Sequence, residues 1–373
     1  PRVLRALSAP VVGHLDPAFL QILNDIRELL QYTFRTENEL TLAMSGTGSA
    51  GMETLFVNLI EPGDRVVVGV NGLFGQRMVE VAHRCGAEVA VVEAPWGQIL
   101  DVEALGRAVA AAPTRMLALV HAETSTGVLQ PLSQLGRLVR EHDALLVVDT
   151  VTSLGGTAVE IDAWGIDAAY SGTQKCLSCP PGLAPVTLGA RAREVLRRRK
   201  RPVQSWYLDL GMIEAYWGED RFYHHTAPVS MLYALREALR LVHQEGLEAR
   251  WERHARLSKA LKAGLGAMGL DLFADAQHAA PMLITVKVPT GVDESAVRRH
   301  LLRHFGIEIG SGLGPVKGKI WRIGLMGESC RPAAVSLLLA ALGSALRAQG
   351  YRADLGAALA AAEAAGLREE APA

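Results

Sequence analysis

Residues 145–175 read LLVVDTVTSLGGTAVEIDAWGIDAAYSGTQK, and this segment is the most informative part of the sequence about the fold. It opens with four aliphatic residues, Leu145 to Val148, and the run ends in Asp149. A short strand that is apolar on both faces is typical of a parallel sheet covered by helices. The stretch closes with Lys175, which lies 26 residues after Asp149 and follows several small residues. It predicts a buried strand ending in a carboxylate, with a loop lysine further along the chain.

The segments before this strand alternate between helix and strand patterns. Apolar residues recur at helical spacing first, and short aliphatic runs then alternate with further helical patterns. The predicted helices are residues 16–40, 74–85, 101–112 and 132–142, and the predicted strands are residues 65–70, 88–92, 116–121 and 145–149. Such an order predicts a doubly wound α/β domain, in which ligands bind beyond the carboxyl ends of the strands. Glu123, Thr124, Asp149 and Lys175 all fall at or after such ends.

The last third of the chain predicts a second, smaller α/β domain. A helical stretch over residues 230–254 connects the two parts, and further strands and helices follow at 281–288, 294–305, 320–325 and 333–349. A chain of 373 residues is long for one hydrophobic core. We therefore expect a large domain over residues 1–246 and a small one over residues 247–373. The tail from about residue 351 is rich in Ala and Glu and predicts no more than a helix.

The composition predicts a cytoplasmic protein without nucleic-acid or membrane partners. Hydrophobic residues make up 49% of the chain and charged residues 21%, with a formal net charge of -1. This balance gives no electrostatic bias toward polyanions, and no apolar run approaches the roughly 20 residues that span a bilayer. Four cysteines fit a reducing compartment.

No metal site is expected. Cys176 and Cys179 form a CxxC pair, but a zinc site needs a second pair at similar spacing. His224 and His225 are adjacent, and adjacent residues of a strand point to opposite faces. We therefore expect the thiols to be structural and the two histidines not to share a metal.

Lys175 and Asp149 together suggest pyridoxal phosphate (PLP) chemistry. The lysine would hold the cofactor as a Schiff base, and the aspartate would pair with the ring nitrogen and keep it protonated. Most lysines are solvated surface groups, however, and most aspartates at strand ends cap a turn or a helix. The pair therefore needs support from other residues suited to the same cofactor.

Two glycine-rich segments give that support. Residues 45–53, SGTGSAGME, precede a predicted helix, and glycines at a helix N-terminus let backbone N–H groups approach a phosphate. Residues 71–75, NGLFG, follow a predicted strand and place Phe74 where an aromatic ring can stack on a flat cofactor. An ordinary glycine turn and a core phenylalanine would explain each segment taken alone.

Taken together, these segments resemble the class V aminotransferases of PLP fold type I. They are most similar to the alanine–glyoxylate/serine–pyruvate aminotransferase group, and the resemblance is clearest between residues 38 and 325. It implies a large domain with a mostly parallel seven-stranded sheet between helices, plus the smaller C-terminal α/β domain. It also implies PLP as the cofactor and a homodimer with active sites at the interface.

The resemblance implies roles for single residues. Lys175 matches the lysine that binds the cofactor, and Asp149 matches the partner of the ring nitrogen. Phe74 and Val151 match the residues on the two faces of the ring. The other residues matched to cofactor contacts are Thr47, Gly48, Ser49 and Gln174 on the phosphate side, and Thr124 near the ring.

Three further residues match the substrate side and the second subunit. Arg322 matches the clamp for the α-carboxylate of the substrate, and a guanidinium can bind a carboxylate through two hydrogen bonds. Tyr223 and Thr226 match residues that reach the phosphate bound by the neighbouring subunit. Relatives often carry tryptophan in place of Phe74, so this chain keeps the stacking ring and loses an indole N–H.

The implied reaction is transamination between a small amino acid, alanine or serine, and a small 2-oxo acid, glyoxylate or pyruvate. A serine–glyoxylate or ureidoglycine–glyoxylate aminotransferase on the same scaffold is the main alternative. A cysteine desulfurase-like PLP lyase would need a loop cysteine before the arginine strand, and residues 309–314 contain none. A non-catalytic sensor domain of a transcription regulator would need a DNA-binding module, and the region before residue 40 is too short for one.

Overall fold

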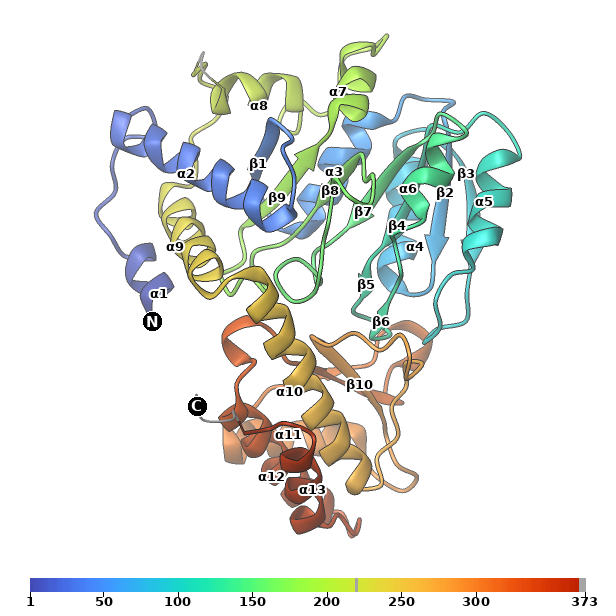
Figure 1. Ribbon diagram of the computed structural model, residues 1–373, viewed down its shortest axis with the longest axis vertical. Helices are drawn as coiled ribbons and strands as arrows, with labels where there is room; N and C mark the ends of the chain where they lie inside the picture. The colour runs from blue at the N-terminus through green and yellow to red at the C-terminus, as the bar shows by residue number, and fades with distance from the viewer. Residues whose placement is uncertain (219–220, 369–373) are drawn as a thin grey trace.

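The computed structural model describes residues 1–218 and 221–368. A larger body carries the N-terminal two thirds of the chain, and a smaller body lies below it in Figure 1. Helix α10 (Leu247–Ala267) runs from the larger body down through the smaller one.

The larger body is built on a seven-stranded sheet. Its order is β1-β9-β8-β7-β4-β2-β3, where β3, β2, β4, β7 and β8 are parallel and β9 is antiparallel to both of its neighbours. The strands are β1 (Leu40–Ser45), β2 (Arg65–Val70), β3 (Glu88–Glu93), β4 (Met116–Val120), β7 (Leu145–Asp149), β8 (Ala168–Tyr170) and β9 (Leu183–Leu188). The predicted fold, with a mostly parallel seven-stranded sheet, is confirmed.

Helices cover both faces of this sheet (Figure 1), as strands that are apolar on both faces require. The helices of the larger body are α1 (Arg2–Leu7), α2 (Pro17–Phe34), α3 (Gly48–Leu59), α4 (Leu73–Arg84), α5 (Val102–Ala110), α6 (Leu135–Arg140), α7 (Ala190–Arg197), α8 (Leu210–Trp217) and α9 (Val229–Glu245), and α1 packs on α9. A short hairpin of β5 (Ala122–Glu123) and β6 (Val128–Leu129) follows β4. The site described below lies where β4, β5, β7 and β8 end.

The smaller body has its own sheet and its own hydrophobic core. Three antiparallel strands, in the order β10 (Leu283–Lys287), β12 (Ile320–Gly324) and β11 (Gly310–Ser311), pack with α11 (Glu294–Phe305), α12 (Pro332–Arg347) and α13 (Leu355–Ala364). The buried residues of the larger body end at Leu247, and those of the smaller body begin at Leu257. This division supports the domain boundary that we propose at residues 246/247.

The alanine-rich tail contributes to that smaller core. Ala358 and Ala362 of α13 are fully buried, and Leu367 is also buried. Helix α13 packs on α10 and α12. Residues 369–373, the end of the predicted C-terminal domain, lie outside the described residues.

The connector between the two bodies differs from the prediction of one helix over residues 230–254. Two helices, α9 and α10, meet at Gly246, whose φ of 82° lies in the left-handed region that favours glycine. In the first turn of α10, the buried Arg250 donates hydrogen bonds to the carbonyls of Gly155 and Cys176. The connector is therefore bonded to the backbone directly after Lys175.

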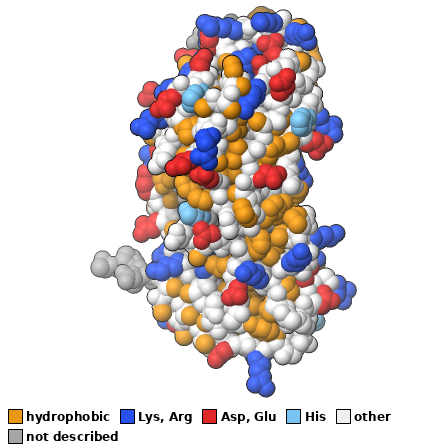
Figure 2. Space-filling view, turned by 90° about the vertical axis from the view of Figure 1, so that its right-hand side faces the viewer, with side chains coloured by type: hydrophobic (Ala, Val, Ile, Leu, Met, Phe, Trp, Pro, Cys, Tyr) orange, Lys and Arg blue, Asp and Glu red, His pale blue; other side chains and the backbone are white. Residues whose placement is uncertain are grey.

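The surface mixes charges of both signs. Figure 2 shows the face on the right-hand side of Figure 1, where Lys/Arg and Asp/Glu side chains are interspersed around a band of hydrophobic ones. This agrees with the net charge of -1. Among the described residues, no helix is both long enough and apolar enough to cross a membrane.

Candidate active site

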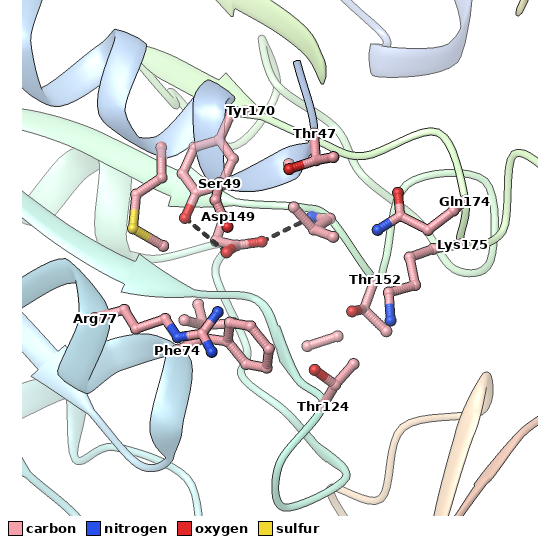
Figure 3. A pocket seen from close by; sticks show the side chains of 15 residues that line it. Thr47, Ser49, Phe74, Arg77, Thr124, Asp149, Thr152, Tyr170, Gln174 and Lys175 are labelled. Carbon is pink, nitrogen blue, oxygen red and sulfur yellow. Dashed lines mark hydrogen bonds between the residues drawn. The ribbon is translucent and has the colours of Figure 1, made fainter. Parts of the chain in front are cut away.

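A pocket opens at the carboxyl ends of the parallel strands (Figure 3). Most of the residues predicted to contact the cofactor line it: Thr47, Gly48, Ser49, Phe74, Thr124, Asp149, Val151, Gln174 and Lys175. They come from the start of α3, the start of α4, the β5–β6 hairpin, the end of β7 and the loops after β7 and β8. The structure thus brings segments that are far apart in the sequence to one place.

Lys175 follows β8 and points into the pocket (Figure 3). Within residues 1–218 and 221–368, its amine has no hydrogen-bond or ion-pair partner. Burial, and then the positive charge of Arg322, lower the pKa of Lys175. A lowered pKa makes the neutral amine more accessible near neutral pH, and the neutral amine is the form that acts as a nucleophile or a base.

Asp149 ends β7 and is almost fully buried. Its Oδ1 accepts the backbone N–H of Val151 at 2.8 Å, and its Oδ2 accepts the hydroxyl of Tyr170 at 2.6 Å. Burial raises the pKa of Asp149 to about 6, and these two donors oppose that rise. Since a carboxylate offers about four acceptor positions, Asp149 retains acceptor capacity beside the pocket.

The start of α3 forms a cradle for an anion. Thr47 is the N-cap residue and its side chain caps no backbone N–H. The N–H groups of Gly48 and Ser49 therefore have neither a capping side chain nor an intrahelical partner, whereas the N–H of Ala50 bonds the Thr47 carbonyl. At Gly48, a Cβ would lie 3.0 Å from a methyl carbon of Val151, so even an alanine would crowd this turn. Free N–H groups at a helix N-terminus, with the hydroxyls of Thr47 and Ser49 beside them, are suited to a phosphate.

Phe74 is held at the start of α4 by a buried carboxylate. The Phe74 N–H donates to Oε2 of Glu123 at 3.0 Å, and the next N–H, of Gly75, donates to the same oxygen at 3.3 Å. The guanidinium carbon of Arg77 lies over the Phe74 ring, 5.0 Å from its centroid. The backbone that carries the ring is therefore fixed by Glu123.

Glu123 has donors on both oxygens. Besides the two N–H groups of α4, it accepts the backbone N–H of Ser125 at 3.0 Å and the Ser125 hydroxyl at 2.6 Å, both on Oε1. Burial raises the pKa of Glu123, and the donors oppose that rise. Three of these four donors are backbone N–H groups, which cannot accept a proton, so this geometry favours the ionised carboxylate.

These residues fit PLP. A free helix N-terminus suits the phosphate, and Asp149 has acceptor capacity for a protonated ring nitrogen. Phe74 and Val151 supply apolar groups on the pocket wall, and an unpartnered amine, that of Lys175, can bond an aldehyde. The phosphate, the ring nitrogen, the ring faces and the aldehyde thus each have a complementary group in one pocket.

Arg322 lies next to this pocket without lining it. From β12, its Nε donates to the carbonyl of Ser311 at 2.6 Å, and its Nη1 donates to the carbonyl of Thr124 at 3.3 Å. Because a guanidinium has five N–H donors, others remain for a ligand. The proposed clamp is thereby oriented by one residue of each body.

Tyr223 and Thr226 lie outside the pocket of their own chain. Their hydroxyls are 3.3 Å apart, and Tyr223 is 60% exposed. Phe222 and Trp206 are also exposed, at 68% and 58%. These exposed positions are compatible with the predicted contact of Tyr223 and Thr226 with the phosphate bound by a second subunit.

His224 and His225 correct one prediction. The segment is not a strand, and the rings do not point to opposite faces, because their Nδ1 atoms lie 2.8 Å apart. His225 Nε2 bonds the Ser45 hydroxyl at 2.8 Å, and His224 stacks on Trp206. In the part of the chain that the structure describes, no three His, Cys, Asp or Glu side chains gather as metal ligands.

The structure adds pocket residues to which the sequence assigns no role, namely Met52, Arg77, Val120, Ala122, Thr152 and Tyr170. Tyr170 is the most informative of them. It lies directly opposite Asp149 in the parallel pairing of β8 with β7. A strand prediction over residues 168–170, aligned with residues 147–149, would have found it.

Known proteins resemble the chain over almost its whole length. A sequence model of the family described as aminotransferase class-V matches residues 5–332. The (S)-ureidoglycine–glyoxylate transaminase of Bacillus subtilis is 45% identical over 97% of this chain and 91% of its own length. The alanine–glyoxylate aminotransferase of Drosophila melanogaster is 41% identical over 95% of this chain and 92% of its own. The crystal structure of an alanine–glyoxylate aminotransferase from Nostoc sp. superposes with a TM-score of 0.91 at 50% identity, covering 92% of each chain.

Proposed function

Because the chain belongs to the class V aminotransferase family, we propose that it transfers an amino group from alanine or serine to glyoxylate or pyruvate. The protein is an aminotransferase and its cofactor is PLP. The observation that carries the proposal is the single pocket that joins the unpartnered Lys175 amine, Asp149 and the open N-terminus of α3.

Bound PLP supplies an electron sink for the electron pair that remains when a substrate loses its Cα proton. Asp149 would hold a proton on the ring nitrogen, which keeps that sink strong. Thr47, Gly48 and Ser49 would hold the phosphate, and Phe74 would pack on the ring. Each assignment uses a group whose hydrogen-bonding or packing capacity is free in the structure.

Lys175 would bond the cofactor at rest and move the substrate proton during the reaction. Its lowered pKa favours an amine that can accept the Cα proton as a general base and return it as a general acid. The positive charge of Arg322 contributes to that lowering. Lys175 and the proposed carboxylate clamp are thus electrostatically linked.

A test of Lys175 uses a chemical readout as well as activity. We expect borohydride reduction of the PLP-loaded protein to attach the cofactor to the peptide that contains Lys175, as seen by mass spectrometry. Lys175→Ala should lose both this attachment and transamination. Lys259→Ala, which changes an exposed lysine of α10, is the matched control. A wild-type protein that takes up no PLP would refute the proposal.

Arg322 would bind the α-carboxylate that alanine, serine and the 2-oxo acids share. Arg322→Lys removes the planar fork, so KM for both substrates should rise by roughly 10-fold or more while PLP affinity stays unchanged. Arg298→Lys, in the pair with Glu294 of the same helix α11, is the control. An unchanged KM in Arg322→Lys would exclude this role.

The amino donor has a second candidate, (S)-ureidoglycine. The ureidoglycine–glyoxylate aminotransferase structure from Bacillus subtilis superposes with a TM-score of 0.96. An activity matrix decides between these amino donors. It tests alanine, serine, aspartate and (S)-ureidoglycine as donors against glyoxylate, pyruvate and 2-oxoglutarate as acceptors. We expect glyoxylate to be the best acceptor, and the donor with the highest kcat/KM identifies the activity.

We also propose a homodimer in which Tyr223 and Thr226 of one copy complete the phosphate site of the other. The exposed aromatic side chains around Tyr223 support this arrangement. Light scattering should give twice the 40.0 kDa of one chain. Mixing inactive Lys175→Ala with a Tyr223→Ala/Thr226→Ala variant should restore activity, because one site of each mixed dimer is intact. A fully active monomer would contradict the proposal.

We further propose that the protein works in the cytoplasm. All four cysteines are buried and unpaired, as in proteins of reducing compartments. Fractionation of cells that express the protein is the direct test.

A further inference from the structure

Tyr170 is a buried side chain of the pocket that the proposed mechanism does not use. It ends β8, its ring is fully buried, and its hydroxyl donates to Oδ2 of Asp149 at 2.6 Å (Figure 3). This is the only side-chain donor to Asp149 among the described residues. A short hydrogen bond of this kind to a carboxylate is stronger than one between neutral groups.

The backbone of Tyr170 is held independently of that hydroxyl. Its carbonyl accepts both the backbone N–H and the side-chain hydroxyl of Thr150, each at 2.8 Å. Its side chain packs closely on α3, where a Cβ at Gly51 would lie 3.1 Å from the Cβ of Tyr170. Tyr170→Phe should therefore keep the ring in place and remove the donor alone.

Burial raises the pKa of Tyr170 well above its ordinary value. The hydroxyl therefore keeps its proton over the working pH range and acts as a permanent donor. A donor that points at a carboxylate favours the ionised form of that carboxylate. Asp149 must be ionised in order to pair with a protonated ring nitrogen.

On the proposed function, in which PLP occupies this pocket, we propose that Tyr170 is a positioning residue that keeps Asp149 charged and aimed at the ring nitrogen. With the N–H of Val151 on Oδ1 and the Tyr170 hydroxyl on Oδ2, the carboxylate plane is fixed from both sides. The remaining acceptor positions are left for the cofactor.

Other charged groups in or near the pocket also act on Asp149 or lie beside it. Glu123 disfavours the ionised form of Asp149, and Lys175 favours it. Arg77 also lines the pocket, from α4. Tyr170→Phe leaves all three in place, so a change in the pH dependence reports on the lost hydroxyl.

The experiment measures the dissociation constant of PLP from the full-length apoprotein between pH 5 and pH 9. Wild-type affinity should weaken as the pH falls through about 6, where Asp149 takes up its proton. In Tyr170→Phe the same weakening should occur roughly one to two pH units higher, since a hydrogen bond to a charged group is lost. Titrations of PLP itself are common to both proteins and cancel in the ratio.

Tyr351→Phe is the matched control. Its hydroxyl bonds the carbonyls of Met268 and Gly269 in the smaller body, so the same atom is removed far from the pocket. Its PLP profile should coincide with that of wild type. In the Asp149→Asn background, Tyr170→Phe should produce no pH shift, because no carboxylate is left to titrate.

Incorporation of 3-fluorotyrosine at position 170 alone gives a second test that does not depend on the folding of Tyr170→Phe. The fluorinated phenol is a stronger donor of nearly the same shape, so the weakening of PLP affinity should move to lower pH. A loss of affinity in Tyr170→Phe that is equal at every pH would show a purely structural role and overturn the proposal. A wild-type apoprotein that binds no PLP would instead overturn the proposed function.

Discussion

Two carboxylates lie at the carboxyl ends of the neighbouring strands β4 and β7, and they are almost equally buried. Glu123 follows β4, and Asp149 is the last residue of β7. Glu123 is 1% exposed and Asp149 is 4% exposed. Glu123 accepts four hydrogen bonds from the protein, whereas Asp149 accepts two. Only Asp149 has acceptor positions left over.

The difference separates a structural role from a chemical one. A carboxylate whose acceptor positions are filled by backbone N–H groups fixes the chain and has little to offer a ligand. A carboxylate that accepts only two hydrogen bonds from the protein and is open on the pocket side can bind a ligand. The number of filled positions therefore distinguishes the two better than burial does.

The largest expected effect comes from Asp149→Asn. An amide cannot hold a proton on the ring nitrogen, so kcat should fall by roughly 10³-fold, as for the loss of one central electrostatic contact. The fold should persist, because the amide has nearly the same shape. Steady-state kinetics and circular dichroism measure the two quantities. A kcat within about twofold of wild type would remove the distinction between the carboxylates.

Glu123→Gln should lower the stability of the protein more than its activity, in contrast to Asp149→Asn. One side of the amide would face N–H or O–H donors, so about two of them lose their acceptor, and the unfolding free energy of the apoprotein should fall by about 3 kcal/mol. The activity should decrease by only about 10-fold, through displacement of Phe74. Thermal melts and kinetics test both. A stable but inactive Glu123→Gln protein would assign Glu123 a chemical role.

The pH dependence of apoprotein stability should also reveal Asp149. Its pKa in the folded chain, about 6, lies above its ordinary value of 3.8, so ionised Asp149 destabilises the fold above pH 6. As the pH falls from 6 to 4, wild type should gain stability relative to Asp149→Asn, by about 2–3 kcal/mol in total. Parallel denaturation curves for the two proteins at pH 4, 5, 6 and 7 measure the difference. A difference in unfolding free energy that is the same at every pH would mean that burial does not raise the pKa of Asp149.

The smallest effect is expected for Phe74→Leu. Its backbone N–H would stay on Glu123, so apoprotein stability should hardly change. Loss of the aromatic face should weaken PLP binding by about 3- to 10-fold. Equilibrium binding of PLP tests this. A large loss of stability would show that the aromatic ring, and not only the backbone bond to Glu123, stabilises this part of the fold.

Much of the fold could be predicted from local patterns. Strands β2, β4 and β7 are short aliphatic runs that are apolar on both faces, and the predicted and observed bounds agree closely. Strands β8 and β9 give no such signal. β8 has three residues, and β9 contains Pro185 in the interior of the sheet, where proline is unusual. Their pairing is decided by the tertiary structure.

Site residues likewise divide into those that local motifs predict and those that depend on the tertiary structure. Lys175, Asp149 and the cradle at Thr47–Ser49 could be predicted because each belongs to a contiguous motif. Tyr170 could not, because its role depends on the register of β8 against β7, which places residues 21 positions apart side by side. The pairing of His224 with His225 was missed because the strand expected there does not form.

The hydrogen bonds of Arg250 have a consequence for dividing the protein. The two hydrophobic cores separate near Gly246, which would be the natural place to cut the chain into independent halves. A large half that ends there would leave the carbonyls of Gly155 and Cys176 without their guanidinium partner. The two cores are separable in packing, but the segment that carries Lys175 is completed by the first turn of α10, so the halves are not interchangeable modules.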